Sequence, residues 1–210
     1  MLRYALFDLD NTLYPKSCGL MEEIGRRMNQ FMIERLGFSE DTVAEHRDGL
    51  LHSYGTTLNA LRRHYSVDPD EFLEFVHDIP LARFLDYNEA LDRMLEALPL
   101  HKVIFTNADA KHARRVLNRL GILRHFESIV DIHMLEFINK PEHRAYRKVL
   151  DFISADPEEC VLLEDFIVNI RPARKMGITT VLVGDDSNTE GAHHRIDVIT
   201  DLADLLGRIG

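Results

Sequence analysis

Short apolar runs that alternate with helical patterns constrain the fold of this chain more than any other feature. The runs lie at Arg3–Phe7, Lys102–Thr106, Ser128–Asp131, Cys160–Leu163 and Thr179–Val183, and helical patterns occupy Ala110–Leu120, Glu142–Phe152 and Asn169–Met176. Alternating strands and helices favour a parallel sheet, because a crossover between parallel strands is usually a helix. We therefore predict an α/β core, a Rossmann-like doubly wound parallel sheet, with ligands bound beyond the carboxyl ends of its strands.

The connection between the first two runs is much longer than the others. Roughly 85 residues intervene, whereas a strand usually joins a helix through a few residues. Apolar residues recur at helical spacing over Leu20–Leu36, and further helical patterns span Glu40–Ser53, Thr57–Tyr65 and Pro69–Val76. This periodicity predicts a small helical bundle. We expect residues 1–14 and 87–210 to form the catalytic core and residues 15–86 to form an inserted helical cap.

Charge and cysteine content limit the classes of partner and location. The formal net charge of −10 at pH 7 argues against binding to a nucleic acid polymer, because phosphate backbones are bound by clustered Lys and Arg. Cys18 and Cys160 are too few for a disulfide framework, and Cys160 begins an apolar run where a buried thiol is expected. No apolar run approaches the about 18 residues of a membrane span, and the chain begins with a strand pattern rather than a signal peptide. We expect a soluble, unprocessed cytoplasmic protein, and the sequence predicts no oligomeric state.

Two acidic residues, Asp8 and Asp10, follow the first apolar run directly. Alternate residues at a strand end point the same way, so both carboxylates face one site. Such a pair implies a bound metal, a shared proton or both, because two close carboxylates repel each other. A calcium loop counted from Asp8 would need Gly and Glu where Leu13 and Gly19 stand, so that alternative fails. A solvated turn without chemistry remains an alternative for this segment taken alone.

Polar residues also follow the second strand and precede the third core helix. Thr106 and Asn107 offer a hydroxyl and an amide just before a helix start, where they are suited to binding a phosphoryl oxygen. The alternative is that one of them simply caps the following helix. Lys140 lies in a loop before Pro141, which we place in the first helical turn, and its ammonium can point at the site. A lone lysine before proline is more often solvated.

A second acidic pair, Glu164 and Asp165, ends the most apolar of the runs, and Asn169 follows about one helical turn later. Charges at the end of a buried strand are costly unless they face a cation or solvent. A sheet that places Asp165 beside Asp8 would give Mg²⁺ a site of hard oxygen ligands. Capping of the next helix at the surface is the alternative.

Taken together, the motifs resemble those of the haloacid dehalogenase superfamily of phosphatases. They are Asp8-Leu9-Asp10-Asn11-Thr12, Thr106-Asn107, Lys140-Pro141, and Glu164-Asp165 with Asn169. The inserted helical segment is similar to the cap of that superfamily. More narrowly, Phe7–Pro15 and Tyr54–Leu58 are similar to the pyrimidine 5′-nucleotidase branch.

The resemblance implies a role for each acidic residue. Asp8 is expected to attack the substrate phosphorus and form a phosphoaspartate, and Asp10 to protonate the leaving alkoxide and then activate water. Mg²⁺ is expected on the Asp8 carboxylate, the Asp10 backbone carbonyl and Asp165, with Glu164 and Asn169 around it in the second shell. Dehalogenation in the superfamily needs no acid two residues after the nucleophile, so Asp10 favours phosphoryl transfer.

Substrate contacts are expected from both parts of the chain. By the resemblance, Thr106, Asn107 and Lys140 bind the phosphoryl oxygens. In the cap, the segment Tyr54-Gly55-Thr56-Thr57 offers a close backbone approach and hydroxyl donors for a sugar or base; the alternative is an ordinary turn between helices with Thr as a cap. Phe166 departs from the nucleotidase pattern, which usually has a small polar residue there, so its ring either narrows the pocket or packs on the core.

We therefore expect a Mg²⁺-dependent phosphomonoesterase acting on a small phosphate ester, first of all a pyrimidine nucleoside 5′-monophosphate. The alternatives are a sugar-phosphate phosphatase, a phosphomutase and, outside the enzymes, a phospho-aspartate signalling module. The histidines, including His193 and His194 in the polar stretch Asp185–Arg195, show no ligand spacing, and we interpret them as solvated surface residues.

Overall fold

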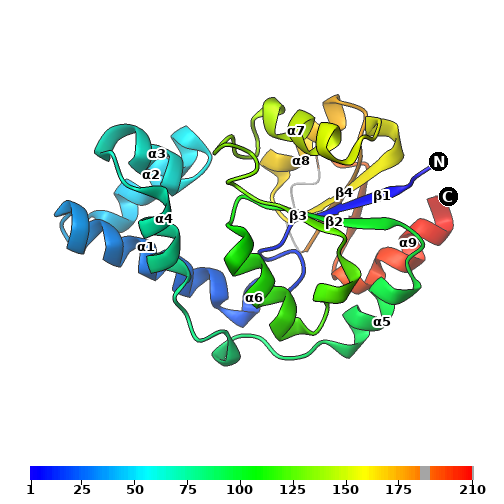
Figure 1. Cartoon of the computed structure of the whole chain (residues 1–210), viewed down its shortest axis with the longest axis horizontal. Coiled ribbons are helices and arrows are strands. Elements are labelled where there is room, and N and C mark those ends of the chain that lie inside the picture. Colours follow the sequence, from blue (N-terminus) through cyan, green and yellow to red (C-terminus); the bar gives the residue numbers. More distant parts are fainter. Residues whose placement is uncertain (185–189, 210) are drawn as a thin grey trace. The chain divides into compact units, whose positions relative to one another are not determined.

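The computed structural model describes residues 1–184 and 190–209, and its core is a six-stranded sheet (Figure 1). The strands are β1 (Tyr4–Phe7), β2 (His101–Phe105), β3 (Ser128–Val130), β4 (Cys160–Glu164), β5 (Thr179–Val183) and β6 (His194–Ile196). Their order is β3-β2-β1-β4-β5-β6, and every neighbouring pair is parallel. The predicted doubly wound parallel sheet is confirmed. The order reverses between β1 and β4, which is where such sheets open a crevice for ligands.

Register brings the ends of β1 and β4 together. Phe7 pairs with Leu163, and the backbone N–H of Asp8 donates to the carbonyl of Leu163 at 2.9 Å. The residue after Phe7 therefore lies beside the residue after Leu163, so Asp8 is next to Glu164.

Helices cover both faces of the sheet (Figure 1). They are α5 (Glu89–Ala97), α6 (Ala110–Leu120), α7 (His143–Ile153), α8 (Ile167–Lys175) and α9 (Leu202–Ile209). Helices α7 and α8 lie on one face, and α5, α6 and α9 lie on the other. On the first face, Tyr146 and Val149 of α7 pack with Leu162 of β4 in a fully buried cluster. Burial of this apolar area stabilises the sheet by about 25 cal/mol per Å².

Helix α6 shows how the sequence sets both ends of an element. The side chain of Asp109 accepts a hydrogen bond from the backbone N–H of His112 at 2.8 Å and so caps the N-terminus. Gly121 ends the helix at φ 78°, a left-handed conformation that glycine adopts without steric cost. Between these caps, His112, Val116 and Leu120 recur at intervals of four residues and are buried on one stripe.

By its internal contacts the chain divides into two compact units, Gly19–Phe84 and a core of Met1–Cys18 with Leu85–Gly210. The helical unit contains α1 (Leu20–Leu36), α2 (Val43–Tyr54), α3 (Thr57–Tyr65) and α4 (Pro69–His77). Within it, the rings of Phe31 on α1 and Phe72 on α4 meet edge to face at 5.1 Å, an arrangement aromatic pairs prefer.

Some local predictions were wrong. His194 begins β6, although we interpreted Asp185–Arg195 as a polar surface stretch with no regular structure; residues 185–189 of this stretch lie outside the described residues. Only Ile196 of this three-residue edge strand is buried, so it has no apolar pattern to detect. Helix α9 was also missed. Helix α7 begins at His143, so Pro141 precedes the helix rather than forming its first turn. Among the described helices, none combines the length and apolar character needed to cross a bilayer.

Candidate active site

The candidate site consists of residues at the carboxyl ends of β1, β2 and β4, together with one residue from the loop that precedes α7. Lys140, from that loop, is only 1% exposed. Its Nζ donates to Oδ1 of Asp8 at 2.7 Å and to Oε2 of Glu164 at 2.6 Å. One buried cation thus bridges the acidic tips of two neighbouring strands.

Burial and mutual charge shift the pKa values of this group. Burial raises the pKa of Asp8 to about 6, although Lys140 opposes the shift. Burial and the nearby Asp8 raise the pKa of Glu164 to about 8. Burial alone would lower the pKa of Lys140, but the two carboxylates raise it above its ordinary value, so Lys140 stays charged. Without this cation the two buried carboxylates would repel each other.

Carboxylate oxygens of Asp8, Glu164 and Asp165 all lie within 4.8 Å of one another. Burial raises the pKa of Asp165, although Lys16, whose Nζ is 3.4 Å from Oδ2, opposes the shift. Carboxylate oxygens are hard ligands of the kind that bind Mg²⁺, usually one or two of them together with waters, so the residues present fit that ion. Lys140 donates to both Asp8 and Glu164, so its hydrogen bonds alone do not select which of the three carboxylates would coordinate the ion.

A tight turn after β1 folds the chain back over its own acidic residues. Asn11 has φ 62°, a left-handed conformation that Asn tolerates better than most residues. This turn returns Thr12, whose hydroxyl donates to Oδ2 of Asp8 at 2.9 Å. Since Lys140 holds Oδ1, both oxygens of Asp8 have a donor and the carboxylate plane is fixed.

Asp10 is held by two other side chains. The hydroxyl of Tyr14 lies 2.5 Å from Oδ1 of Asp10, and Nε2 of His112 lies 3.2 Å from the same oxygen. Burial and the adjacent Asp10 raise the pKa of Tyr14 well above its usual value, so Tyr14 keeps its hydrogen and donates it.

The two polar residues after β2 do not cap α6, since Asp109 does. Asn107 instead forms two hydrogen bonds with the backbone of Lys140. Its Oδ1 accepts from the Lys140 N–H at 2.8 Å, and its Nδ2 donates to the Lys140 carbonyl at 3.1 Å. Thr106 is buried, and its Oγ1 accepts from the backbone N–H of Ala108 at 3.0 Å. The hydrogen bonds from Asn107 therefore help to fix the position of Lys140.

Beyond β4, Phe166 and Asn169 follow the acidic pair along the chain. Asn169 is buried at the start of α8, and its backbone carbonyl accepts from the Tyr146 hydroxyl at 2.6 Å. Phe166 is 48% exposed, so its ring does not pack into the core. Its backbone N–H donates to Oε1 of Glu164 at 3.2 Å, which orients that carboxylate.

The four cap candidates lie at the turn between α2 and α3 of the helical unit. Gly55 ends α2 at φ 75°, and the side chain of Thr56 accepts from the Asn59 N–H at 3.2 Å and caps α3. Thr57 is buried, and the Tyr54 hydroxyl lies 2.5 Å from Nε2 of His64. Helix capping thus accounts for Gly55 and Thr56 locally, and a role in substrate binding stays a prediction.

Sequence reasoning missed Tyr14, His112, Thr12 and Lys16 as neighbours of the acidic residues. His112 corrects our interpretation of the histidines as solvated, because its side chain is 1% exposed. The sequence did contain a signal for His112, because this polar residue occupies the apolar stripe of α6, the helix that follows β2. His193 is exposed, as we interpreted it, although its backbone N–H donates to the carbonyl of Thr180 at 3.2 Å.

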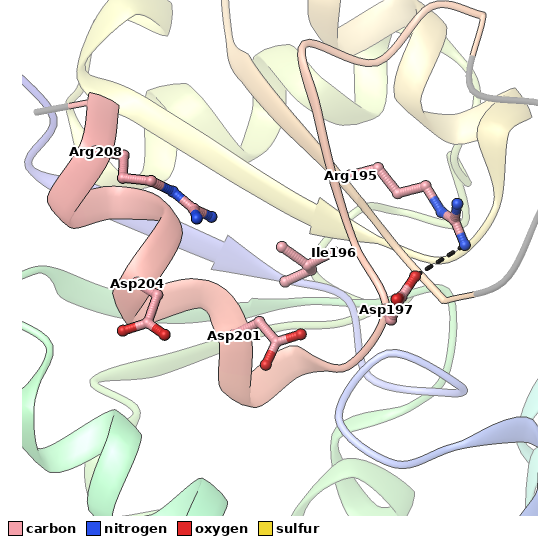
Figure 2. Close-up of a pocket in the computed structure, with 6 residues that line it drawn as sticks. All are labelled: Arg195, Ile196, Asp197, Asp201, Asp204 and Arg208. Carbon is pink, nitrogen blue, oxygen red and sulfur yellow. Dashed lines mark hydrogen bonds and ion pairs between the residues drawn. The ribbon is translucent and has the colours of Figure 1, made fainter.

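A cavity of about 400 Å³ lies elsewhere on the core unit, between β6 and α9 (Figure 2). Its lining residues are Arg195, Ile196, Asp197, Asp201, Asp204 and Arg208. Arg195 and Asp197 pair with each other at 2.9 Å. The lining contains none of the residues at the ends of β1, β2 and β4, so this cavity is separate from the candidate site.

Paired acids and a buried lysine at the switch point of a doubly wound sheet define an enzyme-like active site. A family model for haloacid dehalogenase-like hydrolases matches residues 2–177, and the chain belongs to that family. The match confirms the superfamily that the motifs suggested, without selecting the pyrimidine 5′-nucleotidase branch.

Two curated relatives align along most of the chain. "Phosphate metabolism protein 8" of Saccharomyces cerevisiae is 28% identical over 192 residues, which cover 84% of this chain and 60% of that protein. The chain therefore spans about three fifths of the length of the yeast relative. "Glyceraldehyde 3-phosphate phosphatase" of Methanopyrus kandleri is 26% identical over 198 residues, covering 87% of this chain and 84% of that protein.

Solved structures share the fold at low sequence identity. A HAD phosphatase from Thermococcus onnurineus has a TM-score of 0.68 at 20% identity, covering 98% of both chains. An L-2-haloacid dehalogenase from Xanthobacter autotrophicus has a TM-score of 0.65 at 14% identity, covering 100% of both chains. Proteins with different reactions thus share this fold, so the reaction must be argued from the site itself.

Proposed function

We propose that this chain is a Mg²⁺-dependent phosphomonoesterase that works through a phosphoaspartate on Asp8. The observation that carries the proposal is the buried Lys140 bridging Asp8 and Glu164, with a second acid, Asp10, two residues after the first. A phosphate dianion cannot approach several carboxylates unless cations offset the repulsion. This site has the buried Lys140, the more exposed Lys16 beside Asp165, and a set of carboxylates suited to a metal ion.

In the first step, a carboxylate oxygen of Asp8 attacks phosphorus as the bond from phosphorus to the leaving oxygen breaks. Asp10 supplies the proton that turns the leaving alkoxide into an alcohol. In the second step, Asp10 takes a proton from water while the water oxygen attacks the same phosphorus, which releases phosphate and restores Asp8. The contacts of Thr12 and Lys140 hold Asp8 in one orientation for both steps.

Positive charge and hydrogen-bond donors surround the transferred group. Lys140, with Thr106 and Asn107, is proposed to bind the phosphoryl oxygens where negative charge gathers. Asn107 also fixes the Lys140 backbone through its two hydrogen bonds. The Asp8 and Asp165 carboxylates and the Asp10 backbone carbonyl would hold Mg²⁺, with Glu164 and Asn169 around them. The bound ion would add positive charge at the phosphate.

Asp10 bears on which of two reactions, phosphate ester hydrolysis or dehalogenation, this site is suited to catalyse. A halide leaves without a proton, whereas an alkoxide is a poor leaving group unless an acid protonates it. The hydrogen bonds that hold the Asp10 carboxyl group in place therefore favour phosphate esters over haloacids as substrates.

For the substrate we propose a pyrimidine nucleoside 5′-monophosphate, on the motif resemblance in Phe7–Pro15 and Tyr54–Leu58. A sugar or triose phosphate is the second candidate, favoured by the name of the M. kandleri relative. A screen of phosphate release with Mg²⁺ or with EDTA tests both. Faster turnover of sugar phosphates than of UMP and CMP would remove the nucleotide assignment and keep the phosphatase.

The same screen separates the remaining reactions. Isomerised sugar phosphate without free phosphate would indicate a phosphomutase, and chloride released from 2-chloropropionate would indicate a dehalogenase. A phosphoprotein that persists for hours would indicate a signalling module. If no phosphate ester yields phosphate in Mg²⁺, the proposed function is wrong.

A further inference from the structure

Two buried side chains from distant parts of the sequence meet on one oxygen of Asp10. Tyr14, 3% exposed, reaches Oδ1 at 2.5 Å from four residues along the same turn. His112, 1% exposed, reaches the same oxygen at 3.2 Å from the first turn of α6, more than one hundred residues away in sequence. Neither residue was among the catalytic or binding candidates of the sequence motifs.

The chemistry of the partners fixes the direction of both hydrogen bonds. A carboxylate can only accept, and a neutral phenol has one hydrogen, so Tyr14 donates to Asp10. For the same reason Nε2 of His112 carries the hydrogen in its contact with the carboxylate. Two hydrogen bonds on Oδ1 restrict rotation of the Asp10 carboxyl group.

We propose that Tyr14 and His112 are positioning residues that hold the Asp10 carboxyl group in one orientation for proton exchange with the leaving oxygen. The inference rests on the proposed function, in which Asp10 is the general acid. Both donors hold Oδ1, so the carboxyl group keeps the same orientation while it gives a proton to the leaving oxygen and while it takes one from water. One arrangement thus serves both half-reactions.

The fold sets both donors before substrate arrives. The left-handed Asn11 returns the chain so that Tyr14 lies over Asp10. His112 lies on the buried stripe of α6, and its backbone N–H is fixed by the Asp109 cap. Since both side chains are already immobilised by packing, holding the acid in place costs no further ordering in the transition state.

A leaving-group comparison distinguishes positioning of the acid from general structural support. An alkyl phosphate needs a proton on the departing oxygen, whereas 2,4-dinitrophenolate is stable without one. Loss of acid positioning should therefore slow alkyl phosphates and spare 2,4-dinitrophenyl phosphate. The quantity to compare is kcat/KM, because it includes departure of the leaving group and excludes the later hydrolysis of the phosphoaspartate.

The experiment uses the full chain with Mg²⁺ and four variants: Tyr14→Phe, His112→Leu, His112→Gln and the control Tyr87→Phe. Tyr87 also donates its hydroxyl to a buried aspartate, Asp92, at 2.8 Å, so the control deletes the same group from a similar bond away from the site. The substrates are 2,4-dinitrophenyl phosphate and the alkyl phosphate that the wild-type protein hydrolyses fastest. Thermal unfolding of each variant reports on its fold.

We expect Tyr14→Phe and His112→Leu to lower kcat/KM for the alkyl phosphate by about tenfold or more and for the dinitrophenyl ester by less than about twofold. His112→Gln, which keeps an N–H donor, should recover part of the loss in kcat/KM. Tyr87→Phe should leave kcat/KM unchanged for both substrates. Equal losses on both substrates, or no loss in Tyr14→Phe, would overturn the inference while leaving the phosphatase intact. A wild-type protein that hydrolyses neither ester would instead overturn the proposed function.

Discussion

Replacing Lys140 with Met tests the electrostatic design of the site without reference to any substrate. Met keeps an apolar stem of similar length but removes the ammonium that Asp8 and Glu164 share. All three side chains are almost fully buried, so neither carboxylate can regain solvation by a small movement. Above about pH 8, where both acids are ionised, the variant must therefore hold two uncompensated carboxylates in the core or protonate one of them.

The size of the effect follows from this burial. Removing one partner of a buried ion pair costs about 3–5 kcal/mol, because the remaining charge is left without compensation. For a chain of this size, each kcal/mol lowers Tm by about 2–4 °C, so Lys140→Met should lower Tm by about 6–20 °C. The measurement is thermal unfolding by circular dichroism at about pH 9, where Glu164, whose pKa is about 8, is mostly ionised. EDTA is added because a bound divalent cation would offset the missing charge.

Two further variants make the test specific. Lys102→Met is the matched control, since the Lys102 ammonium donates to the backbone carbonyls of Leu98 and Leu100 at 2.7 and 2.9 Å rather than bridging two buried acids. The double variant Lys140→Met/Glu164→Gln should be more stable than Lys140→Met alone, because it also removes one of the uncompensated carboxylates. A double variant no more stable than the single one, or an equal loss in the Lys102 control, would refute the reasoning.

Three other outcomes are expected. Asp8→Asn should reduce phosphate release by at least about 10³-fold, because an amide is not a nucleophile at phosphorus; a rate near wild type would end that assignment. Asp165→Asn should weaken Mg²⁺ binding, measured by calorimetry, by about 10–100-fold; unchanged affinity would place the ion elsewhere. Hydrogen bonds from Arg124 and then His125 hold the pKa of Asp92 below its usual value. The ionised Asp92 carboxylate therefore stabilises the fold above about pH 4, and this stabilisation is lost as the pH falls further. Asp92→Asn should have a lower Tm than the wild type at pH 7, and its Tm should change less than that of the wild type between about pH 4 and 2, as measured by thermal unfolding.

The parts of the site at strand ends were accessible from the sequence. Asp8 and Asp165 follow buried apolar runs, and a parallel sheet collects such ends on one edge, so their proximity follows from topology alone. The same argument found Asn107 but not its partner, because a side-chain contact with the Lys140 backbone depends on the path of a loop. The sequence offered Lys140 as a cation that can point at the site, but an isolated lysine before a proline is more often solvated, so its role on the phosphoryl oxygens came from the resemblance.

Residues that act through tertiary contacts were much harder to predict. Tyr14 stands inside the first motif, yet its contact with Asp10 requires the left-handed backbone at Asn11, which the sequence permits but does not demand. Strand β6 was missed for a related reason: its place at the sheet edge leaves one buried side chain, so its pairing with β5 has no counterpart in the hydrophobic pattern.

His112 shows what a sharper sequence argument would use. On α6 it occupies a position that helical periodicity assigns to the apolar stripe, together with Val116 and Leu120. A buried imidazole is costly unless it is hydrogen-bonded, so a histidine on such a stripe implies a polar partner inside the protein. Because α6 starts just beyond the carboxyl end of β2, beside β1, the nearest predicted acids were Asp8 and Asp10. Helical periodicity, the cost of burial and the strand order together would therefore have predicted from the sequence that His112 lies in this site.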